Sequence, residues 1–431
     1  MADIIITHQY DAFLRGFNTK AHFLVRFQAP EAPKELAERP PLNLALVIDQ
    51  SSSMRGHPLK EAKSCAEMII DSLKPTDKAS LTVYSNTAEL IVPNTPITDK
   101  SKIKKAISEI HATGMTALFD GWKTGANSLP KTKEEFCRVL LLSDGQANRG
   151  LTHIPSIKEE AAAYSDKGIT TSTYGLGLNF NEDLMLQLAD SGGGNAYYGA
   201  TADDLSDPFA EEFELISNLY AKDVKLRLLP KEGFEMKVQN LYRKDGKHMT
   251  RLPNLAYDSE IWALIEVSID PTFITQPEGE SVDMGVIEMF YKDLTGEEHK
   301  LPAVSISLPN LSAVPFKQLK ENDVVRGRIQ EIRAAALQEE ASRAVDQQNW
   351  DELARLLKNA KENAKDNKWL EDVILAMERM LKQKQHRELS LELKFSSSKM
   401  RKRLAAKREF LDSTDSSVSF LRRKMRQGKK E

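Results

Sequence analysis

Oxygen-bearing side chains gather in a short loop near the start of the chain. Asp49, Ser51 and Ser53 stand at alternate positions directly after the apolar run 44–48, and a helical pattern begins at about Pro58. Carboxylate and hydroxyl oxygens suit a hard divalent cation such as Mg²⁺. The loop holds no cysteine or histidine, and the 8 histidines of the chain are scattered without a ligand spacing, which disfavours a softer metal. These residues therefore predict a site for a hard cation.

Two further oxygen-bearing residues occur in loops that the same sheet would place nearby. Thr116 follows Gly114 and Met115, and Asp144 follows the apolar run 139–142 with a glycine after it. Ligands of open α/β sheets bind at the carboxyl ends of the strands, so these loops are expected to converge with that of Asp49. The alternative is a set of hydrogen-bonded capping loops that hold no metal.

Alternating strand and helix patterns from 42 to about 218 predict the layer that positions these loops. The expected fold class is α/β, a doubly wound and mostly parallel sheet with helices on both faces. The run 44–48 is apolar throughout, as in strands covered on both sides. The strands are expected at 43–48, 79–85, 88–92, 138–143 and 169–175, and the helices at 58–73, 101–111, 117–128, 154–167, 181–190 and 203–218. The glycines 192–194 are interpreted as a turn, and the three-residue link 85–87 predicts an antiparallel edge strand.

The remaining segments predict a β-sandwich and a helical C-terminal part. Antiparallel strands are expected at 224–229, 234–238, 261–269, 281–291 and 303–308, and helices at 323–347, 351–364 and 368–383. Strand patterns at 4–7 and 22–27 would complete the sandwich, which makes the α/β domain an insertion. The predicted divisions are 1–40 (strands and linker), 41–219 (α/β domain), 220–312 (sandwich), 313–385 (helical bundle) and 386–431 (basic tail).

Composition and charge limit the functional classes. The chain of 431 residues is 41% hydrophobic and 29% charged, and no apolar run approaches the roughly 20 residues that span a membrane. The start has no basic region before an apolar stretch, which argues against a secretory signal. Cys65 and Cys137 lie far apart and are expected to be free thiols. These features favour a cytoplasmic location.

The formal net charge of −3 conceals an acidic body and a basic tail. The tail carries an apolar stripe of Met400, Leu404 and Leu411 among cations, so it is expected either to dock on the acidic body, to be disordered, or to bind a partner. Few aromatic residues are present there, which disfavours nucleic acid, and a membrane is not favoured either. The candidate partner-binding residues of this tail are Arg401, Lys402, Arg403, Lys407 and Arg408.

From Leu42 to about Leu215 the chain resembles the von Willebrand factor type A domain with a metal-ion-dependent adhesion site. The usual motif is Asp-x-Ser-Gly-Ser, and here Ser52 stands in place of the glycine, which leaves the ligand positions intact. Further support comes from the segments 116–120, 142–145 and 174–177. The resemblance implies that the hydroxyls of Ser51, Ser53 and Thr116 bind the ion, and that Asp49 and Asp144 bind it directly or through water.

The resemblance also implies a function. Asp120 is a candidate residue behind the ligands, and the ion is expected to be Mg²⁺, with Mn²⁺ or Ca²⁺ as substitutes. An Asp or Glu of a partner protein would complete its coordination, so the chain is expected to be a binding or assembly module, not an enzyme, with no small-molecule substrate. It resembles bacterial cytoplasmic proteins in which such a domain has a flanking β-sandwich and a helical C-terminus, some of which act with AAA+ ATPases.

Two other functions compete with this interpretation. A metal-dependent phosphohydrolase of the haloacid-dehalogenase type has a similar topology, but it needs a second aspartate where Ser51 stands. A secreted or surface adhesin would need an export signal, which the chain is not expected to have.

Overall fold

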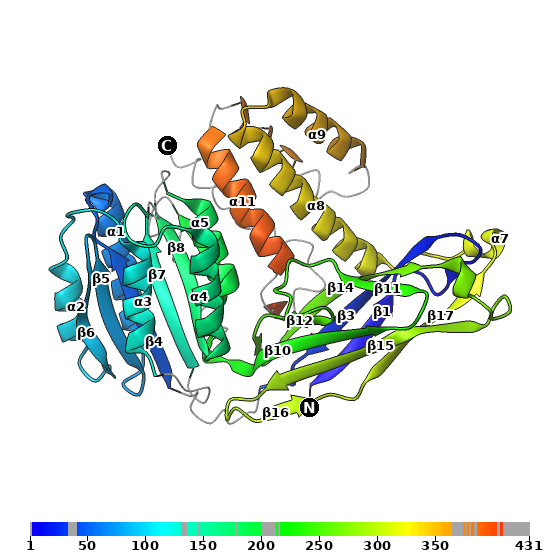
Figure 1. Cartoon of the computed structure of the whole chain (residues 1–431), viewed down its shortest axis with the longest axis horizontal. Coiled ribbons are helices and arrows are strands. Elements are labelled where there is room, and N and C mark those ends of the chain that lie inside the picture. The colour runs from blue at the N-terminus through cyan, green and yellow to red at the C-terminus, as the bar shows by residue number, and fades with distance from the viewer. Residues whose placement is uncertain are drawn as a thin grey trace. The chain divides into compact units, whose positions relative to one another are not determined.

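Figure 1 shows the course of the chain in the computed structural model of the protein. The chain forms two compact units: residues 35–218 with 294–296, and residues 1–34 with 219–293 and 297–431. The structure describes residues 2–32, 41–130, 136–144, 147–176, 180–199, 213, 216–363, 374–375, 377–378, 381–382, 386–402 and 406–407.

The unit of residues 35–218 is built on a six-stranded sheet, which confirms the predicted α/β class. The strand order is β6-β5-β4-β7-β8-β9, and all neighbours run parallel except β6, which pairs antiparallel with β5 at one edge. The strands are β4 (Leu42–Asp49), β5 (Lys78–Tyr84), β6 (Ala88–Pro96), β7 (Phe136–Ser143), β8 (Ile169–Leu176) and β9 (Gly193–Gly199).

Helices cover both faces of this sheet, and its central strand is accordingly buried at every position (Figure 1). Leu44, Leu46 and Ile48 pack in one core with α1 and α2, whereas Val47, between them, faces Gly125 of α3 on the other side. The helices are α1 (His57–Ser72), α2 (Lys100–Ser108), α3 (Leu118–Ser128), α4 (Ile154–Asp166) and α5 (Glu182–Ser191). The helix predicted at 203–218 falls almost wholly outside the described residues.

The interpretation of glycines 192–194 as a turn is wrong for all but the first of them. Gly192 ends α5, but Gly193 and Gly194 begin β9, the edge strand of the sheet. A Cβ at Gly194 would overlap the backbone of Thr171 in β8 and lie 2.7 Å from Ser172 Oγ. Glycine is therefore needed because β9 approaches β8 too closely for a side chain, and this constraint removes the apolar pattern that marks a strand.

The second unit contains two sheets that pack face to face, and their strands pair antiparallel except for β2, which pairs parallel with β17. The first has the order β1-β3-β14-β11, and the second has the order β12-β10-β15-β17-β2. Phe27 of β3 contacts Tyr291 of β15 across the layers, with ring centroids 5.6 Å apart. The strands are β1 (Asp3–His8), β2 (Phe13–Leu14), β3 (Thr19–Gln28), β10 (Leu219–Pro230), β11 (Phe234–Val238), β12 (Met249–Arg251), β13 (Leu255–Ala256), β14 (Ser259–Ile269), β15 (Ser281–Lys292), β16 (Glu298–Lys300), β17 (Val304–Leu311) and β18 (Ala406–Lys407).

The N-terminal strands belong to this sandwich although more than two hundred residues separate them from their partner in the chain. β3 pairs along its whole length with β14, from Thr19 opposite Ile269 to Gln28 opposite Glu260. The unit of residues 35–218 is therefore inserted between two parts of the sandwich sequence. The five predicted domain divisions stay predictions.

Helices of the C-terminal part pack on the sandwich and on one another. α8 (Asp323–Asp346) is capped by Asn322, whose side chain accepts hydrogen bonds from the amides of Val324 and Val325. The first turns of α8 pack on Trp262 of β14. α7 (Ala313–Phe316) precedes it, and α9 (Trp350–Asn363) follows it. The segment predicted as a basic tail begins with a helix, α11 (His386–Lys402), which lies along α8 with Ser390 bonded to Asp346 at 2.6 Å. None of the described helices is long and apolar enough to cross a membrane.

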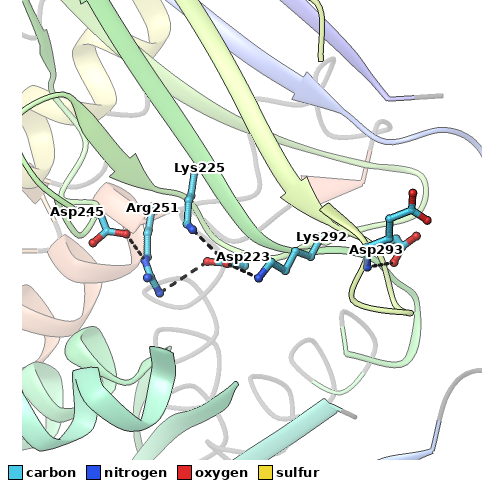
Figure 2. A network of polar contacts seen from close by, with 7 residues as sticks. Asp223, Lys225, Asp245, Arg251, Lys292 and Asp293 are labelled. Carbon is cyan, nitrogen blue, oxygen red and sulfur yellow. Dashed lines mark hydrogen bonds and ion pairs between the residues drawn. The ribbon is translucent and has the colours of Figure 1, made fainter. Parts of the chain in front are cut away.

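Alternating charges lie on and beside β10, β12 and the end of β15 in the second sheet, as Figure 2 shows. Asp223 has a positive φ of 52° at an irregularity of β10. Its carboxylate lies 3.3 Å from Lys225 Nζ and 3.7 Å from both Lys292 Nζ and Arg251 Nη1, and Arg251 also contacts Asp245 at 3.0 Å. These contacts fix the direction of Lys292 at the end of β15.

Candidate metal centre

Asp49 is the last residue of the central strand, and both neighbouring strands hold its carboxylate. Oδ2 accepts a hydrogen bond of 2.6 Å from Ser143 Oγ of β7 and one of 3.3 Å from the Tyr84 hydroxyl of β5. Oδ1 accepts the backbone amide of Ser51 at 2.8 Å. The side chain is wholly buried. The orientation of Asp49 is thus set by the parallel register of three strands.

Burial makes the charge of Asp49 costly. Its pKa is raised to about 6, chiefly by loss of hydration and also by the nearby Asp144 carboxylate, while the hydrogen bonds from Ser143 and Ser51 oppose the rise. Two carboxylates therefore share one buried edge of the sheet. A divalent cation there would oppose both the loss of hydration and the repulsion between the carboxylates, because it would favour their ionised forms.

The two serines of the loop lie together beside Asp49. Ser51 Oγ is 2.9 Å from Ser53 Oγ, and Ser51 is buried whereas Ser53 is exposed. A short 3₁₀ turn over Ser52–Met54 brings the hydroxyls together before α1 begins. The amide of Ser52 donates to the carbonyl of Gly114 at 3.0 Å, which ties this loop to the one that carries Thr116.

Thr116 is held at the same edge by backbone contacts on both sides. Its amide donates to Asn148 Oδ1 at 2.9 Å, and its carbonyl accepts the amides of Asn148 and Arg149 at 3.2 and 3.3 Å. The next amide, of Ala117, donates to Ser85 at the end of β5. Thr116 is 1% exposed. The loops after β5 and β7 therefore both form hydrogen bonds that fix the position of Thr116.

The two remaining predicted residues are positioned by the strand and the helix that carry them. Asp144 comes directly after β7 and is buried, close enough to Asp49 to perturb its pKa. Asp120 lies in the first turn of α3 with its side chain exposed; a Cβ added to Gly150 would lie 3.2 Å from its Oδ2. Asp120 thus stands against the loop that follows Asp144.

Comparison with known proteins identifies the domain that carries these residues. Residues 43–211 match the family model of the von Willebrand factor type A domain. The chain contains a von Willebrand factor type A domain. The uncharacterized protein sll0103 of Synechocystis sp. is 33% identical over 191 residues, which cover 44% of this chain and 45% of that protein. The uncharacterized protein YfbK of Escherichia coli is 23% identical over 348 residues, or 75% of this chain and 59% of that protein. The chain thus spans about half the length of both curated relatives.

The similarity of solved structures extends beyond this domain. The structure of a von Willebrand factor type A protein from Catenulispora acidiphila superposes with a TM-score of 0.71 at 18% identity, over 92% of this chain and 96% of that one. At that identity the match shows the fold, including the sandwich and the helical part, and not the function.

Residues that orient the candidate site were not predicted from the sequence. Tyr84, Ser143 and Asn148 hold Asp49 and Thr116, as described above. Ser143 precedes Asp144 in the same motif, which is a signal, but its bond to Asp49 follows only from the register of β4 and β7. Tyr84 and Asn148 carry no sequence signal, because each acts across a strand or loop distant in the chain.

The structure separates the candidate residues of the basic tail. Arg401 and Lys402 end α11, and Lys407 lies in β18, which pairs antiparallel with Ser259 and Glu260 of β14. Arg403 and Arg408 lie outside the described residues. The described part of the tail thus returns to the sandwich, and its role in partner binding stays a prediction.

Proposed function

We propose that the chain is a metal-dependent protein-interaction module that works without catalysis. Its von Willebrand factor type A domain binds one Mg²⁺, for which Mn²⁺ or Ca²⁺ can substitute. The bound cation supplies a positively charged position for an Asp or Glu of a partner protein. The proposed ligands are Asp49, Ser51, Ser53, Thr116 and Asp144, with Asp120 behind them.

The observation that carries this proposal is the buried pair of carboxylates beside a pair of hydroxyls. Asp49 is held by three hydrogen bonds, so its position does not depend on the ion, and Asp144 lies close enough to raise its pKa. Ser51 and Ser53 add neutral oxygens at 2.9 Å from each other. Because three of the five proposed ligands are uncharged, the site retains attraction for a further carboxylate.

Ser51 also supports binding over hydrolysis. A phosphohydrolase of similar topology uses an acid two residues after its nucleophilic aspartate, and the hydroxyl of Ser51 instead contacts Ser53. A serine hydroxyl does not release a proton near neutral pH as a general acid must. We therefore expect no turnover of an aryl phosphate by the purified chain, and turnover that Asp49→Asn abolishes would contradict this.

Isothermal titration of Mg²⁺ into wild type, Asp49→Ala and Asp166→Asn tests the metal site. Asp166 is an exposed acid at the end of α4, at the opposite edge of the sheet, so its variant controls for general loss of negative charge. We expect Asp166→Asn to bind as wild type does and Asp49→Ala to lose the heat. Equal heats for all three proteins would refute the proposed site.

A pull-down with and without EDTA, followed by mass spectrometry, addresses the partner. We propose a cytoplasmic protein that presents an acidic residue, and an AAA+ ATPase is the partner class that the family resemblance favours. Partners that remain bound in EDTA or to Asp49→Ala would not use the metal. A membrane or nucleic acid is not proposed as a partner.

A further inference from the structure

A second group of metal-binding side chains lies in the sandwich, at the hairpin between β15 and β16. Asp293, Glu297 and His299 each offer one ligand atom, and these atoms all lie within 4.8 Å of one another. The turn of the hairpin between two paired strands, and not a helix, brings the three residues together. For this reason the scattered histidines in the sequence gave no signal of a site.

The hairpin fixes the Asp293 carboxylate. The amide of Asp293 donates to the carbonyl of Glu297 at 3.0 Å, which closes the turn. In return, the amide of Glu297 donates to Asp293 Oδ1 at 3.0 Å. One carboxylate oxygen is thus used by the turn, and the other, Oδ2, is directed toward His299.

The imidazole of His299 is held by two contacts. Its Nε2 lies 3.0 Å from Asp293 Oδ2, and its ring stacks on Tyr291 with centroids 5.0 Å apart and 22° between the planes. Tyr291 is itself anchored, because its hydroxyl lies 3.1 Å from that of Tyr220. Two ligand atoms bound tetrahedrally to one zinc ion at about 2.0–2.1 Å lie about 3.3 Å apart. The nitrogen and oxygen are therefore already near the required separation.

The charges next to the turn favour a cation. Lys292 directly precedes Asp293 but extends toward Asp223, as Figure 2 shows, with its Nζ 3.7 Å from that carboxylate. On the other strand, Lys300 lies 2.7 Å from Glu288. Both lysines that flank the hairpin thus contact carboxylates outside the cluster. With a neutral imidazole, Asp293 and Glu297 give the cluster a formal charge that a divalent ion would neutralise.

We propose that Asp293, Glu297 and His299 bind one transition-metal ion of the zinc class. Imidazole nitrogen with carboxylate oxygen suits Zn²⁺ or Co²⁺, whereas the all-oxygen set at Asp49 suits Mg²⁺. Three protein ligands leave at least one coordination position open to water or to a partner. All three proposed ligands belong to the sandwich unit, whereas Asp49 and the other proposed Mg²⁺ ligands belong to the unit of residues 35–218.

Titration of Co²⁺ and Zn²⁺ into the full chain tests this site. The experiment uses the Asp49→Ala background with excess Mg²⁺, so that the other proposed site does not contribute. We expect one equivalent of Co²⁺ with a visible absorption band that Zn²⁺ removes. His299→Ala should weaken binding at least ~10-fold, and Asp293→Asn should do the same while keeping Oδ1 as the acceptor of the turn. His248→Ala, at an exposed histidine elsewhere in the sandwich, should bind as the parent does.

Two outcomes would overturn the proposal. One is an absence of stoichiometric binding in the Asp49→Ala background, which would make Asp293 and His299 an ordinary ion pair that stiffens the hairpin. The other is unchanged binding in both His299→Ala and Asp293→Asn. Thermal unfolding without metal identifies loss of folding, because a variant that binds weakly but unfolds as the parent does has lost only the site.

Discussion

Substitution of Gly121 by alanine should destabilise the von Willebrand factor type A domain, although alanine is the better helix former. Gly121 lies in α3 against Tyr84, and an added Cβ would overlap the ring and lie 2.8 Å from Tyr84 Cβ. Tyr84 is fully buried and cannot turn into solvent. Overpacking of this kind costs about 1–3 kcal/mol, and helix propensity returns about 1 kcal/mol. The upper half of the range applies to an enclosed ring, so we expect a net loss of about 1–2 kcal/mol.

The same change reaches the candidate metal centre, because the displaced Tyr84 hydroxyl donates to Asp49. Gly121→Ala should therefore also weaken the binding of Mg²⁺. Gly327→Ala is the matched control: Gly327 lies in α8 with no other atom within 4 Å of an added Cβ. That variant should be more stable than wild type by about 0.5–1 kcal/mol.

Urea unfolding followed by hydrogen-exchange mass spectrometry measures these effects, because peptides from β4 and from α8 report on the two units separately. Wild-type stability of Gly121→Ala in the β4 peptides would contradict the predicted overlap with Tyr84. Destabilisation of α8 by Gly327→Ala would also contradict it, since contact with Tyr84 would then not explain the difference between the two glycines.

Three further predictions concern other described residues. Asn148→Ala should lower the Mg²⁺ affinity and destabilise the domain by about 1–3 kcal/mol, because it leaves the buried amide of Thr116 without its acceptor. Titration measures the affinity and urea unfolding measures the stability. An unchanged affinity would argue against a role for Thr116 in binding the ion. Burial lowers the pKa of His22 despite the attraction of Glu266, so the unfolded chain binds the proton more tightly and the free energy of unfolding should fall as the pH drops below 6.5. His22→Gln should flatten this pH dependence in unfolding curves from pH 7.5 to 5. An unchanged slope would contradict the assignment of the pH dependence to His22. Burial raises the pKa of Cys65 to about 12, so a thiol reagent at pH 8 should label it only after unfolding, and rapid labelling of the folded chain would contradict its burial.

The sequence predicted the elements whose pattern is local. The uniformly apolar strand before Asp49 and the 3.6-residue periodicity of the helices led to the doubly wound sheet and to the loops that carry Asp49, Thr116 and Asp144. α11 was not predicted, because Leu389, Leu391, Leu393 and Phe395 alternate as in a strand. All four are buried in a helix that is covered on several sides, so the apolar positions are not confined to one face.

The supporting contacts of the candidate site could not be predicted from the sequence. The bonds that Ser143 and Tyr84 donate to Asp49 depend on the offset between neighbouring parallel strands, which no turn fixes. β9 was missed because close approach to Thr171 requires glycine where a strand pattern needs apolar residues. In each case tertiary proximity selects the residue, and local propensity gives no indication of it.

The pairing of β3 with β14 sets an order of events during synthesis. The ribosome releases β3 roughly 240 residues before its partner, which at about 5–20 residues per second is a delay of about 10–50 s. During that time β3 can pair only with β1, and its apolar residues Phe23, Val25 and Phe27 lack the rest of the sandwich that buries them. The inserted domain can complete its own sheet in this interval. A nascent chain stalled after residue 218 should therefore carry a folded domain and an exposed N-terminal hairpin, which makes this hairpin the segment most in need of a chaperone.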